Sequence, residues 1–173
     1  KVPFLAYKYG RLCKKLKLTH SFSLLSRPNY INILSKRFGN HKYKIIISER
    51  AHPSLQYGYQ DFKSIANKFL IRNLYSESEM VICNSHGNAL DLVKNFGLPK
   101  EKTCIIHNPI DLQKIDSVPA LENYFDKKFF NLISVGRLDQ GKNFKLLINS
   151  VSNIPNVRLY ILGEGAEQQE LER

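Results

Sequence analysis

The chain has 173 residues, of which 43% are hydrophobic and 24% are charged, so it is large enough to fold around one core or two small ones. This composition excludes a disordered chain, and three cysteines without paired spacing favour a reducing cytoplasm over a disulfide framework. The sequence contains no run of about 18 to 20 apolar residues that could span a bilayer, and its start lacks the apolar region of a secretory signal peptide.

The net charge of +11 is concentrated in the first part of the chain. Residues 1–75 hold 15 Lys or Arg and 2 acids, whereas residues 76–173 hold 11 Lys or Arg and 13 acids. This excess of basic residues indicates a binding partner that is an anionic membrane surface or a phosphorylated substrate. The alternative is a solvated basic face without a partner. No RNA-binding or DNA-binding motif is present, so we expect no nucleic-acid partner.

Helical and strand patterns alternate along the chain. Apolar spacing predicts helices over residues 4–18, 28–37, 59–75, 85–95 and 142–151, and another that begins at residue 166. Apolar runs predict strands over residues 22–25, 43–48, 80–83, 103–106, 131–135 and 157–162. In the helix over 59–75, one apolar stripe holds Phe62, Ile65, Ala66, Phe69 and Leu70. Short strands separated by helices predict an α/β fold, in which right-handed crossovers would form doubly wound parallel sheets.

The alternation breaks once, between about Asn108 and Asp126, where Pro109 and Pro119 stand among mixed charges. We therefore expect parts of two domains, over residues 1–111 and 131–173, joined by a linker over residues 112–130. The second part has only two recognisable strands, fewer than an independent domain usually needs. Both ends also look cut, so we expect a fragment of a larger two-domain protein.

The most informative segment is the turn that follows the strand over 131–135. Gly136 ends the strand, Arg137 follows it, and Lys142 stands where the next helix is predicted to begin. Cations are unfavourable near the positive end of a helix dipole unless an anion joins them, and free N–H groups there add to an anion site. The pattern predicts a diphosphate-binding turn, although two ordinary surface cations remain the alternative.

A second glycine turn, Gly163-Glu164-Gly165, follows the strand over 157–162. Glycines at the carboxyl end of a parallel strand let a ligand approach the backbone. The dinucleotide fingerprint would need a further glycine where the chain has Gln168, so this turn is a weak Rossmann signature. A plain tight turn is the alternative.

Ionisable and polar groups follow three strands of the first part. Glu49, Arg50 and His52 come after the strand over 43–48, and His52 is suited to proton transfer near neutral pH. Candidate acceptor-binding residues after the neighbouring strands are Arg27, Asn29 and Ser85. The alternatives are a local Glu49–Arg50 pair, a loop histidine, and helix caps or turns. No Cys/His spacing indicates a metal site, and no G-x-S-x-G turn indicates a serine nucleophile.

Taken together, the motifs resemble group 1 glycosyltransferases, which are retaining enzymes of the GT-B fold with two facing Rossmann-like domains. From residue 107 onward, the motifs that carry this resemblance are His107-Asn108-Pro109-Ile110-Asp111, Ser134-Val135-Gly136-Arg137-Leu138, Lys142-Asn143, Leu162-Gly163-Glu164-Gly165 and Leu171-Glu172. Nearer the start of the chain, Val81-Ile82-Cys83-Asn84-Ser85 looks like the family's strand that ends in serine before the last helices of the acceptor domain. Two further motifs, Leu25-Ser26-Arg27-Pro28-Asn29 and Ile46-Ile47-Ser48-Glu49-Arg50, look like the bacterial branch that extends polyprenyl-diphosphate-linked sugars.

The resemblance implies roles for individual residues. Arg137 and Lys142 match the pair that holds the donor diphosphate, and Gly163-Glu164-Gly165 matches the loop beside the donor nucleotide. His52 lies near the position of an active-site histidine in the family. Residues 1–111 would then belong to the acceptor-binding domain and residues 131–173 to the nucleotide-sugar-binding domain. The glycine-rich donor loop and the paired-glutamate motif of the family are absent from this stretch, so the fragment alone is expected to be inactive.

We therefore expect a metal-independent glycosyltransferase without a cofactor. It would move a hexosyl or N-acetylhexosaminyl group from a nucleotide-sugar donor, expected to be UDP-linked, to a lipid-linked or polysaccharide acceptor. The expected location is the cytoplasm, peripheral to the inner face of the cell membrane, with the basic helix over residues 8–17 against anionic lipid. Two alternatives remain: a non-catalytic module that binds nucleotide or lipid phosphate, and a dinucleotide-dependent oxidoreductase.

Overall fold

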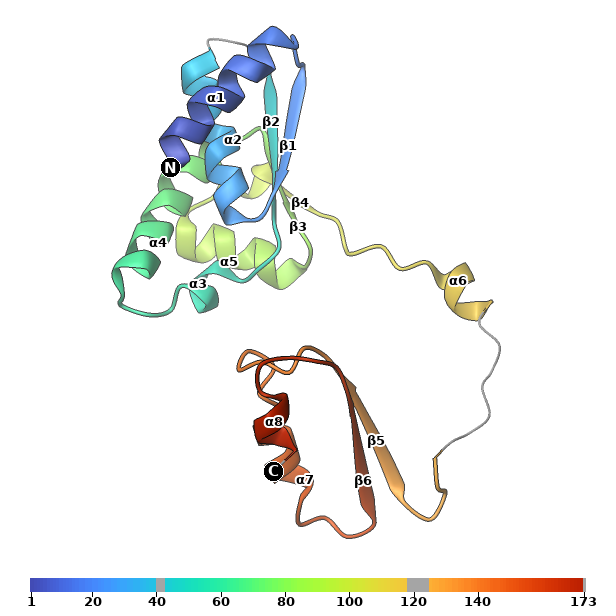
Figure 1. The fold of residues 1–173 in the computed structure, drawn as a ribbon. Coiled ribbons are helices and arrows are strands. Elements are labelled where there is room, and N and C mark those ends of the chain that lie inside the picture. Colours follow the sequence, from blue (N-terminus) through green and yellow to red (C-terminus); the bar gives the residue numbers. More distant parts are fainter. Residues whose placement is uncertain (40–42, 118–124, 173) are drawn as a thin grey trace. The chain divides into compact units, whose positions relative to one another are not determined.

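The computed structural model describes residues 1–39, 43–117 and 125–172 of the chain, and it divides into two compact units (Figure 1). Unit 1 spans Lys1–Asp111 and unit 2 spans Leu112–Arg173. The division falls inside the segment in which the alternation of helix and strand breaks. The roles of the two parts as acceptor and donor domains stay a prediction.

Unit 1 contains a four-stranded parallel sheet. In the order in which they lie side by side, its strands are β1 (His20–Leu24), β2 (Lys44–Glu49), β3 (Met80–Cys83) and β4 (Thr103–Ile105). The register pairs Phe22 with Ile46 and Ile47 with Val81. Because all four strands run in the same direction, their carboxyl ends lie along one edge of the sheet. The loops that follow them carry the candidate residues of unit 1.

The helices of unit 1 connect and cover these strands. They are α1 (Val2–Lys15), α2 (Ser26–Gly39), α3 (Pro53–Gln56), α4 (Phe62–Leu74) and α5 (His86–Phe96), with short 3-10 turns at Tyr75–Glu77 and Lys100–Lys102. Figure 1 shows α1 and α2 packed side by side. Side-chain caps set two of the starts, since Asp61 accepts a hydrogen bond from the amide of Ser64 and Ser85 accepts one from the amide of Asn88. Gly97 ends α5 in the left-handed region, at φ 72°.

The core of unit 1 lies between the sheet and its helices. Its fully buried apolar side chains include Ile33, Ile45, Ile47, Ile71, Val81 and Leu92. The isoleucine run of β2 supplies two of these, as expected for a central parallel strand. Cys13 and Cys83 are buried and Cys104 is half-buried, and all three are free thiols.

Three of the five residues in the apolar stripe of α4 do not face this core, whereas Leu70 packs against it. Phe62, Ile65 and Phe69 are 87%, 56% and 65% exposed, whereas the buried residues of the helix are Ser64, Ile71 and Leu74. The capping contact of Asp61 with Ser64 fixes the rotation of the first turn and places Ser64 inside. Phe62, Ile65 and Phe69 therefore form an exposed apolar surface of unit 1.

Unit 2 contains two parallel strands, β5 (Phe130–Val135) and β6 (Val157–Leu162), paired from Phe130 with Val157 to Val135 with Leu162. Its helices are α6 (Leu112–Asp116), α7 (Phe144–Val151) and α8 (Gln168–Leu171). Among its described residues, the buried apolar side chains are Leu138 and Phe144. Across the described parts of both units, no helix combines the length and apolar character needed to cross a membrane.

Parallel α/β architecture is confirmed, and the predicted elements recur with shifts of one to three residues at most boundaries. The short helices α3 and α6 were not expected from the pattern. Over the described residues, the four strands of unit 1 lie side by side in sequence order, so its sheet is wound in one direction. The expected doubly wound sheet would need a reversal of this order, which these four strands do not contain. Asn40 was part of the expected end of the helix over residues 28–37, and Pro119 was part of the expected linker. Both lie outside the described residues.

Candidate functional site

The loops at the carboxyl edge of the unit 1 sheet are tied to one another by hydrogen bonds. The guanidinium of Arg50, after β2, donates to the side-chain oxygen of Asn108, after β4. Asn84, after β3, donates through Nδ2 to the carbonyl oxygen of Arg50 at 3.4 Å. His107 donates from Nδ1 to the carbonyl oxygen of Asn84 at 3.0 Å. The edge is therefore one connected polar surface, at the place where α/β proteins bind their ligands.

Glu49 lies beneath this surface rather than on it, because it is only 1% exposed. Its carboxylate accepts hydrogen bonds from the Tyr75 hydroxyl and from the amides of Arg50 and Ala51, the latter two at 3.0 and 3.3 Å. Burial, together with the Glu49 carboxylate, raises the pKa of Tyr75 well above its ordinary value, so this hydroxyl remains a donor. We assign Glu49 to support of the loop, not to contact with a reacting group.

His52 lies on the same loop and keeps part of its ring in solvent, with 41% of its side chain exposed. Its Nδ1 is 3.2 Å from the carboxylate of Asp91, a residue of α5 whose side chain is fully buried. Among the described residues, the other ring nitrogen has no hydrogen-bond partner. The structure thus places His52 where a ligand at the sheet edge could reach it.

The three candidate acceptor residues have different surroundings. Arg27 is exposed at the start of α2. Asn29 is fully buried, donates to the carbonyl oxygen of Ser48 at 2.9 Å, and accepts from the hydroxyl of Ser23 at 2.8 Å. Its amide is used inside the protein, which corrects the expectation that it contacts an acceptor. Ser85 is exposed and caps α5 through the amide of Asn88 at 3.1 Å.

The capping role of Ser85 can be tested by two substitutions. Ser85→Ala is expected to lower the free energy of unfolding by about 1 kcal/mol, because the amide of Asn88 loses its partner. Ser85→Asp should retain that stability, since Asp is an equally good cap. Urea denaturation of both variants measures the difference. If Ser85→Asp is as unstable as Ser85→Ala, the cap is not the stabilising contact.

In unit 2, the loop after β5 borders a hollow of about 560 Å³ that includes Gly136, Arg137, Gly163 and Glu164. The Arg137 side chain is 83% exposed, and its Nε lies 3.4 Å from a carboxylate oxygen of Asp139. An exposed ion pair of this kind is worth only about 0–1 kcal/mol, so an incoming anion can compete for the guanidinium. Arg137 is therefore available to a ligand in this hollow.

Lys142 lies on the same loop, before α7. Its side-chain stem packs near Gly136, where an added Cβ would lie 3.6 Å from Lys142 Cγ. The helix begins two residues later than expected, because Asn143 takes left-handed angles (φ 50°, ψ 47°) and caps it by accepting from the amide of Leu146. The side chain of Asn143, and not an outside anion, occupies that amide. A ligand held by Lys142 would therefore be bound by the loop before the helix.

The glycines of the second loop have a structural reason of their own. A Cβ added to Gly163 would lie 1.8 Å from the carbonyl oxygen of Gly136, and one added to Gly165 would lie 2.2 Å from that of Leu138. The two loops also exchange backbone hydrogen bonds, from Gly136 to Leu162 and from Leu138 to Glu164, each of 3.0 Å. Close contact between the loops accounts for both glycines before any ligand is considered.

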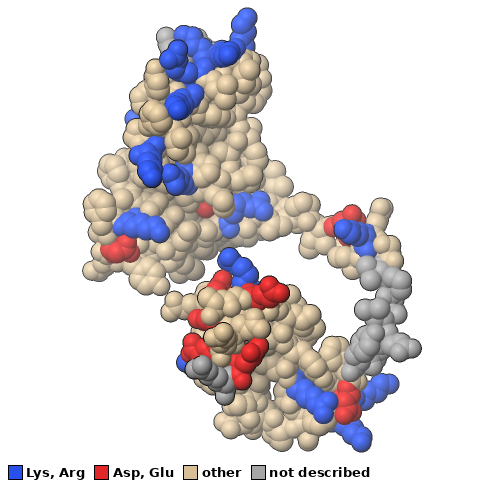
Figure 2. Space-filling view, viewed as in Figure 1, with Lys and Arg blue, Asp and Glu red and all other residues tan. Residues whose placement is uncertain are grey.

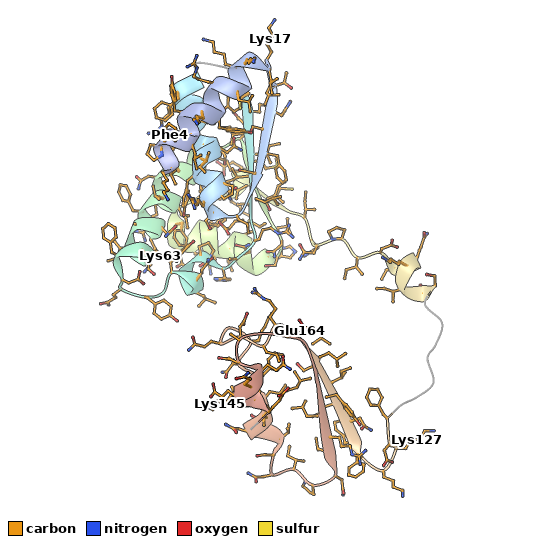
Figure 3. All side chains as sticks on the ribbon, in the orientation of Figure 1. Phe4, Lys17, Lys63, Lys127, Lys145 and Glu164 are labelled. Atoms are coloured by element: carbon orange, nitrogen blue, oxygen red, sulfur yellow. The ribbon has the colours of Figure 1, made fainter. Side chains whose placement is uncertain are left out.

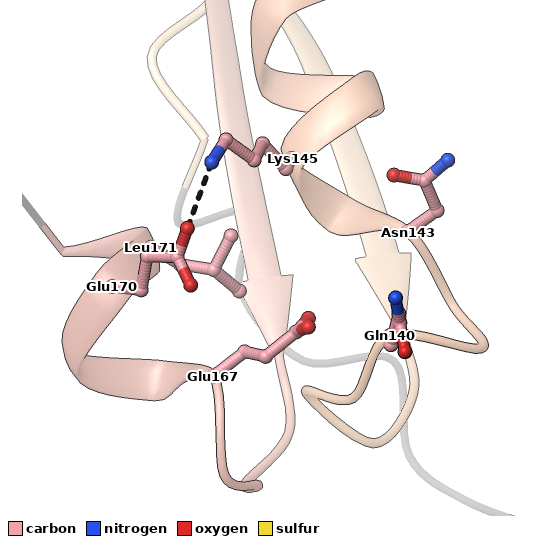
Figure 4. Close-up of a pocket in the computed structure, with 6 residues that line it drawn as sticks. All are labelled: Gln140, Asn143, Lys145, Glu167, Glu170 and Leu171. Atoms are coloured by element: carbon pink, nitrogen blue, oxygen red, sulfur yellow. Dashed lines mark hydrogen bonds and ion pairs between the residues drawn. The ribbon is translucent and has the colours of Figure 1, made fainter.

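A second hollow of unit 2, of about 310 Å³, lies between α7 and α8 (Figure 4). Lys145 points across it to Glu170, with 2.8 Å between the charged atoms, while Glu167 and Gln140 lie below Lys145 in the view of Figure 4. Lys145 and Glu170 are both well exposed. The pair links the two helices, and the hollow contains none of the expected donor residues.

Sequence reasoning missed Asp91, Tyr75 and Asp139, each of which contacts a candidate residue. One signal for Asp91 was available: α5 carries Asn88, Asp91 and Asn95 at helical spacing beside its apolar positions. A carboxylate on the inner side of a helix needs partners, and those partners identify the loop it supports. No local pattern pointed to Tyr75 or Asp139.

The fold and these two loop clusters define a parallel α/β protein with its polar groups at strand ends. Residues 6–114 match the family model described as Glycosyltransferase Family 4. The chain belongs to glycosyltransferase family 4.

Two curated proteins are similar in sequence. One is the N-acetylgalactosamine-N,N'-diacetylbacillosaminyl-diphospho-undecaprenol 4-alpha-N-acetylgalactosaminyltransferase of Campylobacter jejuni, 44% identical over 172 residues, or 99% of this chain and 46% of that protein. The other is the phosphatidylinositol N-acetylglucosaminyltransferase gpi3 subunit of Schizosaccharomyces pombe, 27% identical over 68% of this chain and 26% of that protein. The chain thus spans less than half the length of either relative.

Two solved structures share the fold. HepE of Anabaena, in complex with UDP and glucose, superposes with a TM-score of 0.70 over 96% of this chain and 45% of its own, at 15% identity. The apo form of WaaB, a lipopolysaccharide outer core galactosyltransferase, gives 0.69 over 97% of this chain and 43% of its own, at 16% identity. At such identities the similarity establishes the fold alone, and it confirms the expected GT-B-like fold class.

Proposed function

We propose that the full-length protein transfers a hexosyl or N-acetylhexosaminyl group from a UDP-sugar to a saccharide linked to polyprenyl diphosphate. The observation that carries this proposal is the 44% identity to the Campylobacter enzyme over 99% of the chain, since that enzyme acts on an undecaprenol-diphosphate-linked sugar. The family match over residues 6–114 supports the same reaction class. We also propose that the transfer retains the anomeric configuration of the sugar and uses neither a metal ion nor a protein nucleophile.

Within this proposal, unit 2 binds the donor. Arg137 and Lys142 neutralise the diphosphate, whose negative charge grows as the sugar leaves, and this is where fixed cations are most effective. Gly136 of the first loop and Gly163 and Glu164 of the second border the same hollow. The large exposed fraction of Arg137 is consistent with a side chain that is ordered by its ligand.

The polar edge of unit 1 binds the acceptor. Arg50, half-buried and held by Asn108, offers a guanidinium for an acceptor phosphate or hydroxyl. His52 and Arg27 extend this edge toward the loops after β2 and β1. Bidentate donors such as guanidinium suit phosphate oxygens, which a lipid diphosphate provides.

An assay with the full-length protein tests the activity. Purified enzyme is incubated with an undecaprenyl-diphosphate-linked saccharide and, in parallel, with UDP-GalNAc, UDP-GlcNAc, UDP-glucose or NAD. Extension of the acceptor by one UDP-sugar supports the proposal, and the anomeric coupling of the product reports whether configuration is retained. Binding of UDP-sugar without transfer to lipid-linked or free glycan acceptors would instead support a non-catalytic nucleotide-binding module.

Exposed side chains of unit 1 also support peripheral binding to an anionic membrane. Figure 2 shows Lys and Arg over the part of unit 1 that contains α1. Phe4 and Leu16 of α1 are 60% and 57% exposed, and Lys8 lies over the Phe4 ring, 4.6 Å from its centroid. Figure 3 shows Phe4 and Lys63 on the same side of unit 1, and Lys63 follows the exposed Phe62 in α4. Apolar side chains beside cations are typical of a helix that lies in the bilayer interface.

Removing the apolar stripe of α4 is expected to weaken vesicle binding. The triple variant Phe62→Ser, Ile65→Ser, Phe69→Ser removes three exposed apolar side chains. Complete burial of each side chain in lipid would contribute roughly 1.5–3 kcal/mol to binding. Flotation with phosphatidylglycerol vesicles should therefore fall by at least tenfold, whereas Leu90→Ser on α5, another exposed apolar position, should bind as wild type. Equal binding of all variants, or equal binding to neutral vesicles, would contradict the proposal.

A further inference from the structure

Asp91 is a buried carboxylate whose hydrogen bonds all lead toward the loop of His52 or to its own helix. One oxygen lies 3.2 Å from Nδ1 of His52 and accepts the amide of Ser54 at 3.0 Å. The other accepts from the side-chain amide of Asn95 at 2.6 Å. The amides of Ser54 and Asn95 can only donate, so the site is matched to an ionised carboxylate; the Ser54 hydroxyl lies 3.4 Å from the same Nδ1 of His52.

The charge state of Asp91 agrees with this geometry. Burial raises the pKa of this carboxyl group, but the hydrogen bonds from Ser54 and Asn95 and the neighbouring His52 outweigh it and lower the pKa below its ordinary value. At neutral pH the group is therefore an acceptor only. A neutral His52 beside it must place its proton on Nδ1, which leaves a lone pair on Nε2.

Backbone hydrogen bonds fix the shape of the histidine loop, and the amide of Ser54 joins this loop to Asp91. His52 is the N-cap of α3, and its carbonyl oxygen accepts from the amides of Leu55 and Gln56 at 3.1 and 2.9 Å. Pro53 is buried at the first position of this helix. Asp91 therefore holds a ring whose backbone is already fixed, and the remaining freedom of the side chain is its rotation and its tautomer.

We propose that Asp91 is a positioning residue that holds His52 in the Nδ1–H tautomer, with Nε2 directed to accept a hydrogen bond from a hydroxyl of the acceptor saccharide. The proposal rests on the acceptor role proposed for the edge of unit 1. Asp91 itself, with its side chain fully buried, touches no substrate. Its effect on the reaction passes through His52 alone.

The tautomer can be measured without any assay of activity. In full-length protein labelled with ¹⁵N, two-bond ¹H–¹⁵N correlations distinguish the two neutral forms of imidazole, and the signals lost in His52→Gln identify the residue. The expected result is a neutral His52 protonated on Nδ1. A neutral His52 protonated on Nε2 would overturn the proposal, whether or not the protein transfers a sugar.

Kinetics then test whether Asp91 acts through His52. Asp91→Ala is expected to lower kcat/KM on the order of 10²-fold, as loss of orientation does. The same substitution made in a His52→Ala background should cost almost nothing, because the group that it positions is gone. An equal loss in both backgrounds would mean a structural role for Asp91 and overturn the proposal. Asn95→Ala, which removes a contact to the other carboxylate oxygen, is the matched control and should leave the His52 tautomer unchanged.

Discussion

Replacing both Arg137 and Lys142 with alanine in the full-length protein is expected to weaken UDP-sugar binding by roughly 10²- to 10⁴-fold. A charge-assisted hydrogen bond contributes about 1.5–3 kcal/mol, and the two cations contact the same diphosphate in the proposed complex. Calorimetric titration of UDP and of a UDP-sugar measures the change. A nucleoside without phosphates should bind equally to wild type and variant, because the lost contacts are those to the diphosphate.

The single substitutions separate the two cations. Arg137 borders the hollow with Gly136, Gly163 and Glu164, so Arg137→Ala should have the larger effect on binding. Arg137→Lys is not expected to restore wild-type affinity, because a lysine cannot form the two parallel hydrogen bonds that a guanidinium gives to phosphate. Asp139→Asn removes the exposed carboxylate that pairs with Arg137 and should leave binding equal or slightly tighter.

A matched control removes two other exposed cations from unit 2. Lys127 and Lys128 precede β5, and the double substitution Lys127→Ala, Lys128→Ala changes the net charge by the same amount as the test variant. Figure 3 places Lys127 at the other end of unit 2 from Glu164. If the control weakens UDP binding as much as the Arg137 and Lys142 variant does, general electrostatics and not a diphosphate site would explain the result.

Strand ends were the part of this molecule that the sequence predicted well. The runs over Ile45-Ile46-Ile47 and Leu132-Ile133-Ser134-Val135 are short, β-branched and followed by polar or glycine residues, so both their type and their carboxyl ends could be located. Because parallel strands bring their carboxyl ends together, the clustering of Arg50, Asn84 and Asn108 followed from the fold class. Their individual hydrogen bonds did not.

Two features depended on tertiary contacts that local patterns do not encode. The stripe of Phe62, Ile65 and Phe69 has the spacing of a core-facing helix, but spacing defines a face without saying what covers it. Likewise, the candidate pair of Glu49 and Arg50 differs in burial, since the glutamate is only 1% exposed and is held by Tyr75, 26 residues away in sequence. A polar side chain after a strand can either meet a ligand or support the loop that does.

The glycines of the second loop illustrate the same ambiguity, and they give the other large prediction. Gly163→Ala is expected to destabilise unit 2 by about 3 kcal/mol or more, because the added Cβ would lie 1.8 Å from the carbonyl oxygen of Gly136 and backbone must move. Gly165→Ala should act in the same way through the carbonyl oxygen of Leu138, at 2.2 Å. Neither glycine has positive φ, so the cost comes from contact and not from the backbone conformation.

Hydrogen exchange of individual amides locates this effect. The amides of Gly136 and Leu138 donate to the carbonyl oxygens of Leu162 and Glu164, and their protection should fall in Gly163→Ala while β2 and β3 of unit 1 stay protected. Gly141→Ala is the control, because its Cβ would meet only a side-chain oxygen of Asp139 at 3.3 Å. Unchanged protection in Gly163→Ala would mean that the two loops are not in the close contact described here. UDP binding should fall together with this protection in Gly163→Ala, since residues of both loops border the hollow beside Arg137.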